Sequence, residues 1–270
     1  MRRGLPQEDG VEEGRFQEAS LQTPFRFECK RCGHCCFTCE ILLTPFDILR
    51  LCQFLRMSTS EFLLHFARIS TGPGSGLPVC TLDFKRVAWE RGNDPELAPC
   101  PFLTVLDGHP ACGVYPARPG CCRSYPLGRM VRMEGGVDVF QATLFLQEVH
   151  CAAVETQQEY TVAEWIEHEG LAEYQQAHNL WITQLIALGL MRGRTQSLLP
   201  PETLDMLANL WYNFSVCPGE SLEARYEVGM EDSRRMVEDI TGQPLPQVHA
   251  IRESPTANSL GAQVSIIVPE

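Results

Sequence analysis

Apolar side chains recur at helical spacing shortly after residue 44, next to a strong helix start. Thr44 is a good cap, Pro45 suits the first helical position, and Asp47 places a carboxylate near the positive end of the helix dipole. We therefore predict a helix over about residues 45–56. Cys52 falls on the inner stripe of this helix, where a cysteine behaves as a small apolar residue.

A second helix start follows almost immediately. Ser58 and Glu61 have the SxxE spacing of a capping box, in which each side chain bonds to the other residue's backbone N–H. The apolar residues after it recur at helical spacing and predict one buried stripe: Phe62, Phe66 and Ile69.

The helical pattern returns after residue 160. Thr161 and Glu164 form another capping box, and Gly170 is placed to end that short helix. Longer helices are predicted over about 171–190, 201–214 and 221–240.

The middle of the chain has a different pattern. Residues 100–126 are rich in proline and glycine, which predicts short strands and tight turns. The segments 127–133 and 137–144 alternate apolar and polar residues and predict a hairpin joined at 134–136.

Together these elements predict a helix-rich α+β fold with a core of loops and short strands. Residues 1–27 are polar and are expected to form an N-terminal arm. We predict a cysteine-rich domain over residues 28–160 and a helical C-terminal region over 161–242. A partly disordered tail is predicted over 243–270.

Composition narrows the possible partners. The chain has 270 residues, 44% of them hydrophobic, which is enough for a substantial core. Its formal net charge of −12 disfavours nucleic acid and anionic membrane surfaces, because either polyanion would be repelled. The polar, acidic start lacks the apolar core of a secretory signal, and no apolar run is long enough to cross a bilayer. We expect a cytoplasmic protein with a protein partner whose identity the sequence does not give.

Thirteen cysteines are the most unusual feature of this composition. Five of them fall within CKRCGHCCFTC, residues 29–39. Disulfides are rare in a reducing compartment, whereas cysteines two residues apart on a turn are typical of zinc sites and iron–sulfur proteins. Cys35 and Cys36 are neighbours whose side chains diverge on most backbones, so we hypothesise that this pair serves two adjacent centres or one polynuclear cluster.

Three blocks of this sequence resemble a known family. CxxCxxCC at 29–36 is followed by ILLTPFDILRL, by CPFL at 100–103 and by CGVYPARPGCCRSYP at 112–126. This arrangement resembles the YkgJ-type cysteine-cluster family of zinc- or iron-chelating CxxCxxCC proteins, over about residues 27–175. The resemblance implies bound zinc or iron, with an iron–sulfur cluster included among the possibilities, and eight ligands: Cys29, Cys32, Cys35, Cys36, Cys100, Cys112, Cys122 and Cys151.

The sequence departs from the family pattern in two places. Cys39 and Cys121 are extra thiols, and CAAV stands where the family usually has CPG at the last cysteine, Cys151. The other cysteines, Cys80 and Cys217, stand alone and are expected to be ordinary buried thiols. His34 and His150 lie beside cysteines. For each of them two roles are open, a substitute metal ligand or a solvated loop residue.

Two arginines flank the third block. Arg118 and Arg123 are placed either to donate hydrogen bonds to thiolate sulfur or to form a salt bridge between loops.

Two other functions compete with simple metal binding. CGHC at 32–35 is the dithiol motif of disulfide isomerases, but a thioredoxin fold needs a long helix directly after it, and here Cys36 and FTC follow. Flagellin lysine methylases carry a similar cysteine cluster, which suggests a metal-dependent protein-modifying enzyme. The sequence contains no GxGxxG after a strand, HExxH or GxSxG to support catalysis, and no catalytic residue is assigned.

Overall fold

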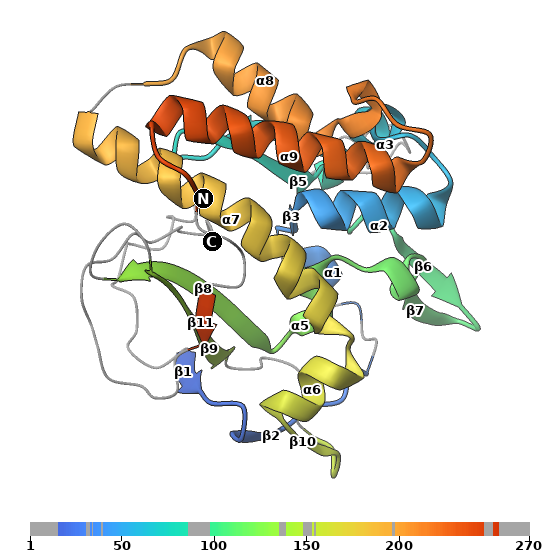
Figure 1. Ribbon diagram of the computed structural model, residues 1–270. Helices are drawn as coiled ribbons and strands as arrows, with labels where there is room; N and C mark the ends of the chain where they lie inside the picture. The colour runs from blue at the N-terminus through green and yellow to red at the C-terminus, as the bar shows by residue number, and fades with distance from the viewer. Residues whose placement is uncertain are drawn as a thin grey trace, which may run out of the picture.

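The fold combines a layer of helices with small sheets (Figure 1). The computed structural model describes residues 16–30, 33, 35–38, 40–85, 98–134, 139–147, 153, 155–195, 198–245 and 251–253. The helices are α1 (Cys35–Thr38), α2 (Pro45–Leu55), α3 (Thr59–His65), α5 (Gly120–Ser124), α6 (Val162–His168), α7 (Leu171–Thr195), α8 (Pro201–Tyr212) and α9 (Leu222–Thr241). Short 3₁₀ turns, η2 and η4, cover Tyr115–Ala117 and Phe214–Val216. The predicted α+β class is confirmed.

The described strands form four separate small sheets. They are β1 (Phe16–Ala19), β2 (Pro24–Arg26), β3 (Leu42–Leu43), β4 (Ala67–Thr71), β5 (Pro78–Leu82), β6 (Leu103–Leu106), β7 (His109–Cys112), β8 (Leu127–Glu134), β9 (Val139–Gln147), β10 (Glu159–Thr161) and β11 (Ile251–Glu253). β8 and β9 pair antiparallel from Leu127↔Leu146 to Glu134↔Val139, which confirms the predicted hairpin. β3, β5 and β4 form a second sheet, β6 pairs with β7, and β2 pairs with β10.

Both ends of the described chain join strand β9. β1 pairs antiparallel with residues 144–147, and β11 pairs parallel with residues 140–142. The described part of the predicted N-terminal arm therefore belongs to two sheets, since β2 also pairs with β10. In the predicted tail, Leu245 is buried in the core. The predicted domain division at residue 160 remains a prediction.

The three capping boxes are present as the sequence indicates. Thr44 begins α2, Ser58 begins α3 and Thr161 begins α6, each bonded to the carboxylate three residues later. The predicted stripe is wrong at Ile69, because α3 ends at His65 and Ile69 lies in β4, paired with Cys80 of β5. The β-branched residues of ARIST favour a strand once the helix has ended.

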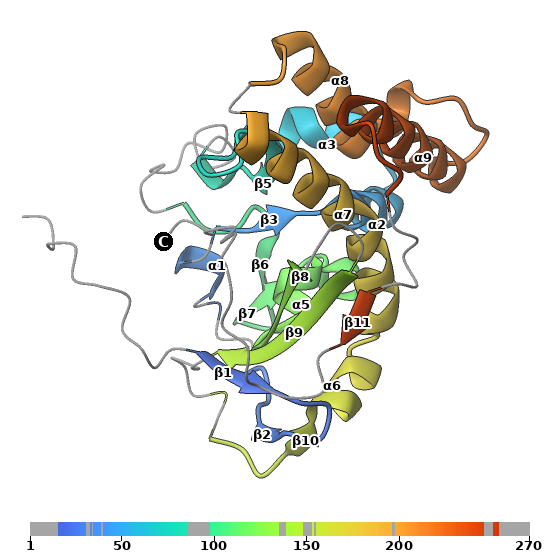
Figure 2. The same ribbon diagram turned by 60° about the vertical axis from the view of Figure 1, so that its left-hand side comes forward.

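The larger hydrophobic core joins elements from both halves of the chain. Its fully buried residues include Leu43, Ile48 and Phe62 from the first half and Trp211 and Phe214 from the second. Figure 2 shows α7 passing between the α8 and α9 side of the molecule and the β8–β9 hairpin. A smaller core surrounds Phe27 and Trp165, whose rings meet edge to face with centroids 5.5 Å apart.

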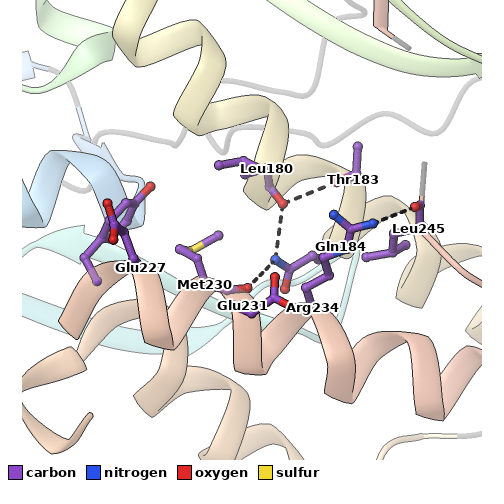
Figure 3. Close-up of a pocket in the computed structure, with 9 residues that line it drawn as sticks. Leu180, Thr183, Gln184, Glu227, Met230, Glu231, Arg234 and Leu245 are labelled. Carbon is purple, nitrogen blue, oxygen red and sulfur yellow. Dashed lines mark hydrogen bonds between the residues drawn. The ribbon is translucent and has the colours of Figure 1, made fainter. Parts of the chain in front are cut away.

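Buried polar contacts join α7 to α8 and α9. The Gln184 side chain donates to the carbonyls of Leu180 and Met230 and accepts from Trp211 Nε1 at 2.9 Å. A cavity of about 160 Å³ lies beside it between α7 and α9 (Figure 3). The polar atoms of Gln184 are therefore used inside the protein, and Glu227, Glu231 and Arg234 supply the charged groups at this cavity.

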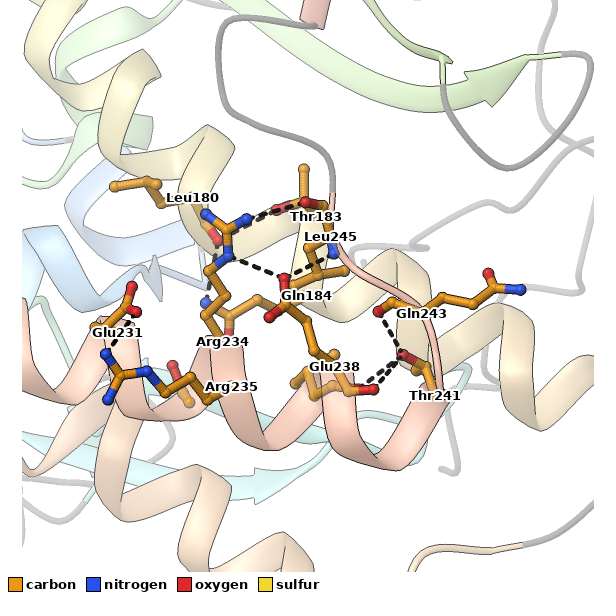
Figure 4. Close-up of polar contacts among 12 residues, drawn as sticks. Leu180, Thr183, Gln184, Glu231, Arg234, Arg235, Glu238, Thr241, Gln243 and Leu245 are labelled. Carbon is orange, nitrogen blue, oxygen red and sulfur yellow. Dashed lines mark hydrogen bonds and ion pairs between the residues drawn. The ribbon is translucent and has the colours of Figure 1, made fainter.

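The segment after α9 is held at the edge of this cavity. Arg234 donates to the carbonyl of Leu245, and the Leu245 N–H donates to Glu238, which also pairs with Arg234 (Figure 4). Leu245 then covers one side of the cavity. Among the described helices, none has the length and apolar composition needed to cross a membrane.

Candidate metal centre

The first cysteine block enters the site through α1. Cys35 and Cys36 open this short helix, with Cys35 exposed and Cys36 half-buried. Gly33 has a φ of 77°, a left-handed conformation that favours glycine, and the Cys36 N–H donates to its carbonyl at 2.9 Å. A Cβ on Gly33 would lie 3.3 Å from Cβ of Pro110, so the chain here runs against the β6–β7 hairpin.

The β6–β7 hairpin brings two more cysteines to one end. Leu103 pairs with Cys112 across the strands, and its N–H donates to the carbonyl of Cys100 at 2.9 Å. Asp107 and Gly108, both with positive φ, make the tight two-residue turn at the other end. Cys100 and Cys112 therefore lie at the base of the hairpin.

A backbone hydrogen bond joins the first two blocks directly. The N–H of Cys100 donates to the carbonyl of Cys36, with 2.6 Å between nitrogen and oxygen. Residues far apart in sequence are thus fixed side by side, as a shared site requires.

The third block is the short helix α5, which carries Cys121 and Cys122. Cys122 is half-buried and packs against the larger core, whereas Cys121 is exposed and donates to the Leu42 carbonyl at 3.6 Å. The first residue of the helix, Gly120, donates its N–H to Asp47 of α2 at 2.7 Å.

Thiols from the three blocks interact with one another. The pKa of Cys35 is raised, first by a hydrogen bond with the Cys36 thiol, and that of Cys36 is raised to about 12, first by one with Cys100. Burial raises the pKa of Cys112, with a further contribution from Cys122. The pKa of Cys122 is raised well above its ordinary value, first by a hydrogen bond with Cys121. These raised pKa values favour the protonated thiols, and a bound metal would reverse that preference by stabilising thiolates.

The arginines of the third block form a buried ion-pair network. Arg118 donates to the Glu169 carboxylate, which is almost fully buried, and Arg123 donates to the backbone carbonyls of Glu169 and Pro116 at 3.0 and 2.7 Å. The predicted salt bridge is therefore present, but it is buried rather than exposed. The Nε of each arginine is also buried and has no hydrogen-bond partner among the described residues.

The donor set fits zinc or iron. Both metals accept thiolate ligands, and buried guanidinium groups next to thiols balance the negative charge that a thiolate site carries. In the described part of the chain, however, no three Cys, His, Asp or Glu side chains lie close enough together to hold a metal ion. The ligand set remains a prediction.

The predicted ligands divide into three groups. Cys35, Cys36, Cys100, Cys112 and Cys122 lie in one neighbourhood. The exposed Cys29 is near enough to Arg118 for their charges to interact. Cys32 and Cys151 lie outside the described residues, as do Cys39, His34 and His150. The three solitary cysteines are buried in the larger core, as expected: Cys52, Cys80 and Cys217.

The thioredoxin alternative gains no support here. α1 covers only Cys35–Thr38, where a long helix would have to follow the dithiol. The strand β2 that precedes the motif pairs only with β10 among the described strands, in a two-stranded ribbon. The CGHC match is therefore better explained by the cysteine cluster.

Two carboxylates near the site were not identified from the sequence. The sequence indicates only a capping role for Asp47 and no role for Glu169. Arg118 and Arg123 are an indirect signal for Glu169, because arginines that become buried need a buried acid as a partner. Its position, next to the glycine that ends α6, gave no indication which acid that would be.

Gly120 leaves little room for a side chain. An added Cβ would lie 3.2 Å from Cδ1 of Tyr174 and 3.4 Å from Oδ1 of Asp47. We expect Gly120→Ala to lower the free energy of unfolding by about 1–3 kcal/mol through overpacking, measured by urea denaturation. The control is Gly189→Ala in α7, where a Cβ meets nothing within 4 Å. There alanine should stabilise the helix by up to about 1 kcal/mol, and an equal loss in both variants would contradict the overpacking argument.

Comparison with known proteins adds one finding. Residues 28–160 match the family model CxxCxxCC, described as "Putative zinc- or iron-chelating domain". No curated protein and no solved structure matches the chain significantly. The match covers all three cysteine blocks, and metal chelation is the function that it suggests.

Proposed function

We propose that this protein chelates zinc or iron through the thiolates of its three cysteine blocks. The observation that carries the proposal is the hydrogen bond from the Cys100 N–H to the Cys36 carbonyl, which ties the CxxCxxCC block to the hairpin that also holds Cys112. The interaction of Cys122 with Cys35 extends the group to α5. The family match supports the same conclusion.

The full proposed ligand set adds Cys29, Cys32 and Cys151 to the five cysteines of this neighbourhood. It comprises Cys29, Cys32, Cys35, Cys36, Cys100, Cys112, Cys122 and Cys151. With all of its positions taken by sulfur, zinc would be structural, because no position is left open for a water molecule. Iron held by the same ligands, as in an iron–sulfur cluster, would supply electron transfer or oxidant sensing. The residues fit both metals, since thiolates suit each of them.

The setting that we propose follows from the charge and the free thiols. A net charge of −12 favours a protein partner over nucleic acid or an anionic membrane. Ten described cysteines are free, which suits a reducing compartment such as the cytoplasm.

Anaerobic purification followed by elemental analysis tests the proposal. We expect zinc or iron at one or more equivalents per chain, retained after passage through a desalting column. Iron–sulfur protein would be brown with charge-transfer absorption, whereas zinc protein would be colourless. Absence of both metals in the isolated protein and after anaerobic reconstitution would refute the proposal.

A further inference from the structure

The carboxylate of Asp47 serves two helices at once. Its Oδ2 accepts from the N–H and the hydroxyl of Thr44, at 2.8 and 2.7 Å, and this caps α2. Its Oδ1 accepts from the N–H of Gly120 at 2.7 Å, at the first residue of α5. The residue is only 1% exposed, so these bonds form away from water, where leaving one unmade is costly.

The far end of α5 is fixed by a separate set of contacts. Arg123 donates to the Glu169 and Pro116 carbonyls, and Trp165 Nε1 donates to the Ser124 carbonyl at 2.9 Å. Arg118, just before the helix, is paired with Glu169. The segment that presents Cys121 and Cys122 is therefore held from α2 on one side and from α6 and the turn after it on the other.

None of these contacts uses a sulfur atom. They are made by carboxylates, guanidinium groups, an indole and the backbone, and they continue into the two hydrophobic cores. From this we infer that Asp47 and Glu169 are positioning residues that place the thiols of α5 before a metal arrives, so that metal can enter and leave without unfolding the chain. The inference rests on the proposed chelating function and adds to it that the site is loaded reversibly.

A matched pair of capping boxes isolates the contribution of Asp47. Glu61 caps α3 with nearly the same geometry, accepting from the N–H and hydroxyl of Ser58 at 2.8 and 2.7 Å, but it is exposed and has no hydrogen bond to the described residues of the cysteine blocks. Asp47→Ala removes a cap and the bond to Gly120, whereas Glu61→Ala removes only a cap. Asp47→Asn keeps an amide oxygen for Gly120 while losing the acceptor for the Thr44 N–H.

The measurement is competitive titration of the reduced, metal-stripped protein with zinc, followed by the absorption spectrum of the cobalt-loaded form. We expect Asp47→Ala to bind zinc about 10- to 100-fold more weakly, the range found when groups that orient metal ligands are removed. Glu61→Ala and Asp47→Asn should stay close to wild type. The wild-type protein stripped with a chelator should keep its helical circular dichroism.

The possible outcomes distinguish failure of the proposed function from failure of the inference. Wild-type protein that binds no zinc would refute the proposed function, and the inference with it. Zinc binding with equal affinity in wild type, Asp47→Ala and Glu61→Ala would leave the function standing and overturn the inference, as would unfolding of the stripped wild type. If Asp47→Ala does not fold, Glu169→Gln compared with Glu164→Gln at the exposed α6 cap decides by the same criteria.

Discussion

Replacing Cys36 by serine should remove most of the bound metal while the helices stay folded. The Cys36 thiol contacts both Cys35 and Cys100, so it stands between the first block and the hairpin. A serine hydroxyl is a poor substitute for a thiolate on zinc or iron. We expect zinc affinity to fall by more than the roughly 10- to 100-fold that follows from changing groups around the ligands. Elemental analysis and zinc titration would measure this loss.

Cys217→Ala provides the control for this change. Cys217 is buried in the larger core, where its Sγ lies beside Gly229 of α9. The Cys217→Ala variant should retain the metal content of the wild type, while its free energy of unfolding falls because the smaller side chain leaves a cavity. Wild-type metal content in Cys36→Ser would contradict its assignment as a ligand. Loss of metal in Cys217→Ala as well would show that metal content merely follows folding.

Replacing Trp211 by alanine should be the most destabilising change in the helical half. The side chain is 0% exposed, and its indole N–H donates to the buried amide oxygen of Gln184. Truncating such a residue costs about 3–5 kcal/mol through the cavity that it leaves. The Gln184 oxygen then lacks its donor, which adds to the loss. Urea denaturation followed by circular dichroism would measure the change.

A residue on the same helix separates packing from helix propensity. Met206 of α8 is largely exposed, so Met206→Ala should change the free energy of unfolding by less than about 0.5 kcal/mol. A loss below about 1 kcal/mol in Trp211→Ala would contradict the single core that α7, α8 and α9 share with α2. Loss of only part of the helical signal would show that the C-terminal helices unfold on their own.

The elements that the sequence predicted well are those set by local chemistry. The Thr44, Ser58 and Thr161 caps depend on residues three positions apart, and their helices begin where the pattern placed them. The β8–β9 hairpin is likewise local. Ile69 shows the limit, because strand β4 exists only through its pairing with β5, which periodicity within one segment does not report.

The candidate site follows the same division. Cysteine spacing identified which residues to consider, since ligands two residues apart leave a mark in the sequence. The role of Asp47 depends on Gly120, and that of Glu169 on Arg118, across distances in sequence that no short motif covers. The sequence therefore indicates the capping role of Asp47 but neither its bond to Gly120 nor the pairing of Glu169 with Arg118.

The pairing of β9 sets the order in which its sheet is completed during synthesis. β8 and β9 are adjacent in sequence and can zip together as soon as residue 147 has left the ribosome, and β1 is already available at that time. The parallel partner of residues 140–142 is β11, which begins only at residue 251. Until more than a hundred further residues have been translated, the backbone groups on this stretch of β9 lack their final partner. The nascent chain thus presents an open strand edge from residue 147 until residue 251 is made, and this interval is when chaperone protection against aggregation would matter for this sheet.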